Sequence, residues 1–199
     1  FEAQMSTVGA IANASESDMV RLTDKAKEMG ATTKFTAVES GQAFEYMAMA
    51  GWKTNQMLNG ISGIMSLAAA SGEDLGITSD IVTDALTAFG LKAKDSAHFS
   101  DVLAQTSASA NTNVSMLGES FKYVAPVAGS MGYSIEDISL ALGLMANASV
   151  KSSIAGRSLK TAIANMAAPT DTMATAMKKY NISLKDSHGG IKDFKSVLD

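Results

Sequence analysis

One apolar pattern closed by a glycine recurs three times in this chain. In each copy, apolar residues stand eight, five, four and one positions before a glycine, and a large apolar residue follows that glycine. The three copies are Ala43, Tyr46, Met47 and Ala50 before Gly51-Trp52; Val82, Ala85, Leu86 and Phe89 before Gly90-Leu91; and Val124, Val127, Ala128 and Met131 before Gly132-Tyr133. The spacing predicts a buried stripe on an α-helix, and the glycine supplies the left-handed residue that ends the helix. The chain therefore repeats a helical unit about every 40 residues.

Capping residues and further apolar stripes extend the helical pattern over most of the chain. Thr36 with Glu39, and Ser134 with Asp137, carry side-chain oxygens that can bind the free amides of a first helical turn. Pro126 is expected to bend or divide its helix, because proline lacks the amide hydrogen. The expected helices span about residues 1–13, 16–30, 36–51, 55–70, 79–89, 96–109, 115–131 and 155–167, and one more begins at 134. No alternating run of strand length is visible, so the sequence predicts an all-α fold with essentially no sheet.

The spacing of the helices suggests how the chain is organised. We expect an N-terminal helical segment at residues 1–30, a helical core of ~40-residue helix-pair units at 31–168, and a truncated C-terminal helical linker at 169–199. This linker is expected to contain a turn at 186–190 and a final helix from Gly190 that is cut at the chain end. The loose repeat fits a stack of helix pairs, and it also fits an ordinary helical bundle.

Five ordered strings carry a resemblance to a known family. They are AFEYMAMAGW at 43–52, SLAAASGEDL at 66–75, TSDIVTDALTAFGL at 78–91, NTNVSMLGESFKYVAPVAGSMGYS at 111–134 and GLMANASVKSSIAGRSLK at 143–160. Together they resemble the core region of phage tail tape measure proteins of the lactococcal-phage type. The resemblance covers roughly residues 1–168. It names a structural role without naming a reactive site.

The resemblance implies a long structural protein of a phage or prophage virion. Such a protein is made in the bacterial host cytoplasm and lies in the lumen of the tail tube. The resemblance implies that it fixes tail length by its own length and leaves before the genome passes. The implied partners are the tail tube protein, tail assembly chaperones, and baseplate or tail-tip proteins.

Composition adds an expectation about assembly. Only 18% of the residues are charged, which is below the usual ~25% and leaves apolar surface thinly screened. We therefore expect neighbours to cover part of the surface, and we expect a homo-oligomer. The net charge of −4 and the scattered lysines argue against sequence-independent binding to the phosphate backbone, which needs a concentrated basic face, and we expect no specific nucleic-acid binding.

The search for reactive groups favours a non-enzyme with no catalytic, cofactor-binding or metal-binding residues. The chain has no cysteine, so thiol nucleophiles and thiolate metal sites are excluded. His98 and Asp101 share a helix face but offer two ligands, whereas zinc needs three or four. The pairs Glu73-Asp74 and Glu136-Asp137 fall in expected first helical turns, where the helix dipole favours negative charge. We therefore interpret these carboxylates as helix caps rather than as an acid and base pair.

One alternative function stays open from the sequence. The least polar stretches, 61–70 and 138–150, are shorter than the ~20 apolar residues that span a bilayer. They are expected to be core helices. The alternative is a membrane-acting helical module that contacts the host membrane and assists genome delivery through the envelope.

Overall fold

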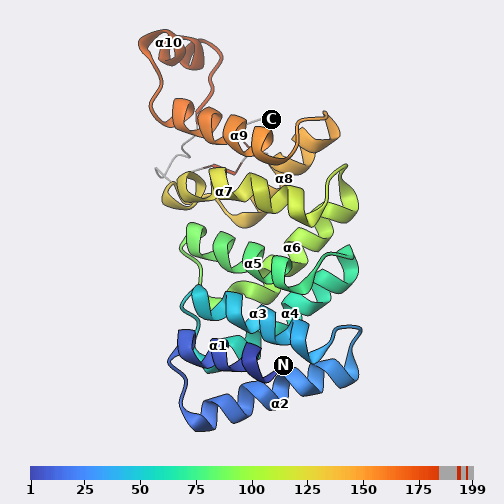
Figure 1. Cartoon of the computed structure of the whole chain (residues 1–199). Helices are drawn as coiled ribbons and strands as arrows, with labels where there is room; N and C mark the ends of the chain where they lie inside the picture. Colours follow the sequence, from blue (N-terminus) through green and yellow to red (C-terminus); the bar gives the residue numbers. More distant parts are fainter. Residues whose placement is uncertain (184–191, 194–195, 197–199) are drawn as a thin grey trace. The chain divides into compact units, whose positions relative to one another are not determined.

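The computed structural model shows an all-helical chain (Figure 1). It describes residues 1–183, 192, 193 and 196; the expected turn at 186–190 lies outside these residues, as does most of the final helix expected from Gly190. The α-helices are α1 (Glu2–Ala12), α2 (Glu16–Thr32), α3 (Ala37–Met49), α4 (Thr54–Ser71), α5 (Leu75–Phe89), α6 (Ser96–Ser109), α7 (Val114–Ser130), α8 (Ile135–Asn147), α9 (Ser152–Ala167) and α10 (Asp171–Lys179), with a 3-10 turn η1 (Ala93–Asp95). The described part of the chain contains no strand, and the predicted all-α class is confirmed.

The three glycines of the repeated pattern end their helices as predicted. Gly51, Gly90 and Gly132 have φ angles of +81°, +73° and +81°, in the left-handed region. The next residue then donates its backbone N–H to the carbonyl five residues earlier, which satisfies a free carbonyl of the last turn. The donor and acceptor pairs are Trp52 and Met47 at 3.0 Å, Leu91 and Leu86 at 2.8 Å, and Tyr133 and Ala128 at 3.0 Å.

Some boundaries differ from the sequence expectation. α5 begins at Leu75 rather than at 79, because the Asp74 side chain accepts a hydrogen bond from the Ile77 N–H at 2.9 Å. The end of α1 agrees with the expectation: the helix runs to Ala12 and is capped by Asn13, whose φ of +49° is reached without a glycine. α7 continues through Pro126 as one undivided helix.

The chain forms two compact units, Phe1–Gln105 and Thr106–Asp199. In unit 1, α3 packs against α1 on one side and against α5 on the other (Figure 1). α2 and α4 each pack against the helix that follows them, α3 and α5 respectively. Unit 1 is therefore a stack of helix pairs, one of the two arrangements that the sequence left open. The sequence-based boundaries at residues 30 and 168 stay a prediction.

Small residues bring the stacked helices of unit 1 close together. A Cβ atom at Gly41 of α3 would lie 3.0 Å from Cγ of Gln4 in α1. A Cβ atom at Gly76 of α5 would lie 3.2 Å from Cε2 of Tyr46 in α3. Nearby, the buried Ser79 hydroxyl donates a 2.9 Å hydrogen bond to the Ala43 carbonyl. These contacts fix which turn of one helix lies beside which turn of the next.

In unit 2, α7 and α9 form the corresponding stacked pair, and α8 packs against both (Figure 1). Gly156 of α9 lies against the backbone of Ser120 in α7, and a Cβ atom there would be 2.8 Å from the Ser120 Cα. The Ser120 hydroxyl donates a 2.8 Å hydrogen bond to the Ser152 carbonyl. Arg157 donates a 2.9 Å hydrogen bond to the Tyr123 hydroxyl, and its guanidinium carbon lies 4.6 Å from the centre of the Tyr123 ring.

The stacked helices α3 and α7 also share sequence. Glycine, phenylalanine, tyrosine and alanine recur at a constant offset of 77 positions; they are Gly41, Phe44, Tyr46 and Ala48 in α3, and Gly118, Phe121, Tyr123 and Ala125 in α7. Both phenylalanines are fully buried. The segment from Gly118 to the closing Gly132 is one helical turn longer than the segment from Gly41 to the closing Gly51. The match is therefore not visible when the two helices are aligned on their closing glycines. The two units therefore contain related stacking helices.

Candidate functional site

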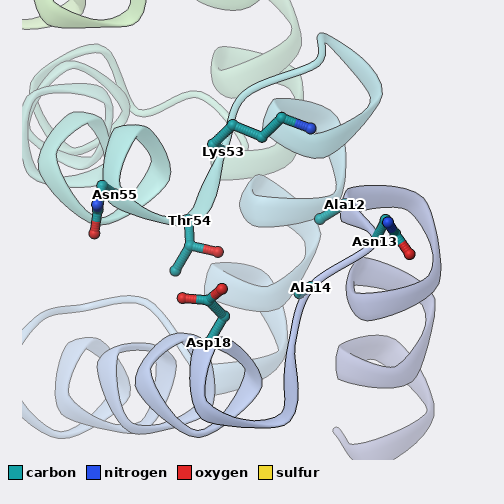
Figure 2. A pocket seen from close by; sticks show the side chains of 7 residues that line it. All are labelled: Ala12, Asn13, Ala14, Asp18, Lys53, Thr54 and Asn55. Carbon is teal, nitrogen blue, oxygen red and sulfur yellow. The ribbon is translucent and has the colours of Figure 1, made fainter.

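A small polar cavity opens in unit 1 where α1, α2 and α4 meet. Its volume is about 190 Å³, and it is lined by Ala12, Asn13, Ala14, Asp18, Lys53, Thr54 and Asn55. Asp18 and Thr54 point toward one another, whereas Lys53 extends away from Asp18 (Figure 2). The loops after α1 and before α4 place these residues together.

Asp18 at this cavity and the neighbouring Arg21 take part in helix capping and exposed pairing. The Asp18 carboxylate accepts a 2.9 Å hydrogen bond from the Ser15 hydroxyl and lies 3.3 Å from Arg21 Nη1. Arg21 also donates a 2.7 Å hydrogen bond to the Asn55 side chain. Asp18 is the one carboxylate among the lining residues, so the cavity offers no acid and base pair. Through Arg21 and Asn55, hydrogen bonding beside the cavity links α2 to the start of α4.

A second cavity of unit 1, about 280 Å³, lies between the end of α2 and the middle of α4. Its lining is Met29, Thr33, Lys34, Phe35, Ser62, Met65, Ser66 and Ala69. The ammonium group of Lys34 donates a 3.3 Å hydrogen bond to the Ala69 carbonyl and lies 5.0 Å from the centre of the Phe35 ring. This cavity is a gap in the packing between α2 and α4 that Lys34 partly bridges.

The carboxylates singled out from the sequence lie at helix starts. Asp74 caps α5 through the Ile77 N–H, and Asp137 forms a reciprocal capping box with Ser134 at the start of α8. The capping interpretation is confirmed for both residues. Asp137 also contributes, after burial, to raising the pKa of the Tyr133 hydroxyl above its usual value.

The remaining sequence candidates do not come together with further ligands. His98 and Asp101 both lie exposed on α6. Within the part of the chain that the structure describes, no group of three or more histidine, cysteine, aspartate or glutamate side chains is placed to hold a metal ion. Among the same residues, no helix has the length and apolar character needed to cross a membrane.

The capping box of α3 predicts a pH effect on stability. The backbone N–H and hydroxyl of Thr36 donate hydrogen bonds of 2.6 and 2.7 Å to Glu39, and they lower the pKa of that carboxyl, backbone bond first. Because the folded pKa is lower than the unfolded one, Glu39 stabilises the fold above about pH 5, and this contribution is lost as the pH falls through the folded pKa.

We expect Glu39→Gln to cost a few tenths of a kcal/mol at neutral pH, since solvent screens this exposed group, and to cost nothing in acid. Urea unfolding of both proteins at several pH values measures the difference. A cost that stays constant from neutral pH to about pH 3 would contradict the assignment.

Comparison with known proteins finds that the chain is similar to phage tail proteins. Residues 23–199 match the model of a family described as phage-related minor tail protein. The chain is 40% identical over 191 residues to the tape measure protein of Pneumococcus phage Dp-1, covering 96% of this chain and 17% of that protein. It is 24% identical over 181 residues to the probable tape measure protein of Escherichia phage P2, covering 91% of this chain and 22% of that protein. No solved structure matches.

These similarities confirm the resemblance seen in the sequence strings. The chain spans about a fifth of the length of the two relatives, so it corresponds to one segment of such a protein. Because the family model covers all but the first 22 residues, the chain belongs to the family of phage-related minor tail proteins.

Proposed function

We propose that this chain is a non-enzymatic structural segment of a tape measure protein, which determines tail length and scaffolds assembly of the tail tube. The observation that carries the proposal is the 40% identity to the Dp-1 tape measure protein over 96% of the chain. The location in the tube lumen belongs to the same proposal. So do the partners that the resemblance implies: tube subunits, assembly chaperones and baseplate or tail-tip proteins.

The fold limits how much this segment can contribute to the length of the tail. A continuous helix converts residues into distance at ~1.5 Å per residue, so the chain would span ~300 Å in that form. In unit 1 the chain instead reverses after every helix, and each helix pair adds a layer to the stack of α1, α3 and α5. Stacked helices lie ~8–10 Å apart, which is ~0.25 Å per residue for a pair of about 40 residues. The folded segment is therefore a poor ruler, and we propose that it acts as a folded module beside the length-setting helices of the parent protein.

Two matched deletions in the parent protein test this proposal. Removing residues 37–74 takes out the α3–α4 pair, and we expect tails to shorten by at most ~10 Å. Removing the same number of residues from a long helical part of the parent should shorten tails by ~57 Å. Electron microscopy measures the tail lengths that result from the two deletions. Unchanged tails after the second deletion would contradict the ruler function, and a ~57 Å loss after the first would show that this segment is extended in the tail.

The membrane-acting alternative is not favoured, since both relatives carry the name of a tape measure protein. It makes a separate prediction, that the purified chain releases dye from lipid vesicles. We expect no release from vesicles of neutral or anionic lipid. Rapid leakage at low protein concentration would favour the alternative.

A further inference from the structure

One position of the stacked helices carries opposite charges in the two units. The helices α3, α5, α7 and α9 each contain a buried glycine, which is Gly41, Gly76, Gly118 and Gly156 respectively. The residue four positions after this glycine is acidic in unit 1 and basic in unit 2: Glu45, Asp80, Lys122 and Lys160. Related helices therefore present a carboxylate in one unit and an ammonium group in the other.

This position belongs to a stripe that each stacked helix leaves open. Residues one, four and eight positions after the glycine share one side of a helix, because their spacing is that of i, i+3 and i+7. All of them are exposed or half-buried: Gln42, Glu45 and Met49 in α3, Ile77, Asp80 and Asp84 in α5, Glu119, Lys122 and Pro126 in α7, and Arg157, Lys160 and Ala164 in α9. We call these three positions the open stripe of a helix.

The open stripes of two packed helices lie side by side within each unit. In unit 1, a Cβ atom at Gly76 would lie 3.7 Å from the Cβ atom of Gln42, so the stripe of α5 begins beside that of α3. In unit 2, Arg157 of the α9 stripe donates a hydrogen bond to Tyr123, which follows Lys122 in α7. Each unit therefore presents two stripes as one surface, which we call the α3–α5 face and the α7–α9 face.

The α3–α5 face is acidic. Its charged residues are Glu45, Asp80 and Asp84, and neither α3 nor α5 contains a lysine or an arginine. Glu45 accepts a hydrogen bond from the amide group of Gln4, a neutral donor that leaves the carboxylate charged. The face therefore carries negative charge from both of its helices.

The α7–α9 face is basic. On α7, Lys122 lies 2.8 Å from the Glu119 carboxylate, so these two charges offset each other. On α9, Arg157 and Lys160 are both exposed, and the helix contains no aspartate or glutamate. The net charge of this face is therefore positive and comes from α9.

Exposed apolar side chains surround the carboxylates of the α3–α5 face. Met49 is 64% exposed and Ile77 is 48% exposed, and Val38, one turn before Gln42 on α3, is 43% exposed. Apolar surface that is grouped in this way, rather than scattered, is typical of a binding surface. The α7–α9 face presents exposed apolar residues as well, at Pro126 and Ala164. Contact between the two faces would therefore bury apolar surface and also bring opposite charges together.

We propose that the α3–α5 face of one copy of this chain binds the α7–α9 face of a second copy. The two faces are built from helices of the same register, so their open stripes can lie against each other, and their charges have opposite signs. Opposite charges favour this pairing, whereas two acidic or two basic faces repel. The interaction requires no role in tail length, and it can be tested on the chain by itself.

Exchanging the charges between the units tests the pairing. Glu45→Lys with Asp80→Lys makes the α3–α5 face basic, and Lys122→Glu with Lys160→Asp makes the α7–α9 face acidic. Each substitution introduces the residue that the related helix of the other unit already holds at that position. Either double variant has two faces of like charge, so self-association should weaken at least about tenfold. Sedimentation velocity measures association, and association of the unaltered chain should weaken with added salt.

Restoring opposite charges separates a loss of pairing from a loss of folding. An equimolar mixture of the two double variants contains one basic α3–α5 face and one acidic α7–α9 face, so the two variants should associate with each other. A chain with all four substitutions should self-associate again for the same reason. Circular dichroism should show the same helical spectrum for every variant. Failure of both the mixture and the fourfold variant to associate would overturn the proposal.

A matched control tests whether net charge alone governs association. Asp24→Lys with Glu28→Lys changes the net charge as much as the first double variant does, on exposed residues of α2 outside both faces. We expect this control to self-associate as the unaltered chain does. A control that dissociates like the first double variant would contradict the proposal. So would an unaltered chain that stays monomeric at all accessible concentrations.

Discussion

Gly156→Ala is expected to destabilise unit 2 by about 3 kcal/mol or more, the upper range for forcing an extra carbon into a packed contact. The added Cβ would meet the Ser120 carbonyl oxygen, and it would lie 2.8 Å from the Ser120 Cα and 2.9 Å from its carbonyl carbon. These are backbone atoms inside α7, so no side-chain rotation can make room. The two helices must separate, which also breaks the hydrogen bond between the Ser120 hydroxyl and Ser152. Thermal and urea unfolding followed by circular dichroism measure the loss.

Gly143→Ala is the matched control, because Gly143 is also a helical glycine of unit 2. Its added Cβ would lie 3.4 Å from the Ala110 Cβ and 3.5 Å from the Thr106 Cγ2, which are ordinary contact distances. Replacing glycine by alanine inside a helix gains up to about 1 kcal/mol of helix propensity. We therefore expect Gly143→Ala to be neutral or slightly stabilising. Equal effects of the two substitutions would contradict the close contact of α7 and α9.

These glycines show which structural features can be predicted from the sequence. Gly51, Gly90 and Gly132 were predictable because the residues before them fix both the helix and its left-handed end. The role of Gly156 was not predictable in this way, since its partner Ser120 is 36 residues away and the local spacing does not reveal it. Local hydrogen bonding sets helix boundaries, whereas tertiary packing decides which small residues carry a close contact.

The same distinction applies to the candidate functional residues. The capping role of Asp74 and Asp137 followed from their position before an apolar run, and the structure confirms it. The exposure of Ser158 and Thr161 on α9 could not be predicted from the sequence, because Ser120 and Tyr123, which hold the same positions relative to Gly118 in α7 as these residues do relative to Gly156, contact another helix. Whether such a face is covered depends on the next layer of the stack rather than on the residues themselves.

Trp52→Ala should cost about 3–5 kcal/mol in unit 1, as is typical for removing a large buried aromatic side chain. Trp52 is 6% exposed, and its ring lies against Gly60 of α4, where an added Cβ would be 2.5 Å from the ring carbon Cζ3. The absence of a side chain at Gly60 lets the indole lie directly against the helix. Removing the indole therefore leaves a cavity that the α4 backbone cannot fill. Unfolding followed by circular dichroism measures the loss, because the variant has no tryptophan for fluorescence.

Leu91→Ala provides the control for this prediction, because Leu91 holds the same place in the repeated pattern. Both residues follow a left-handed glycine, and both donate a backbone N–H to the helix end, which alanine retains. Leu91 is 37% exposed, so its truncation should cost less than about 1 kcal/mol. The difference between the two variants thus isolates side-chain burial from helix termination. A similar cost for both would mean that the helix end, rather than the indole packed on Gly60, is what Trp52 stabilises.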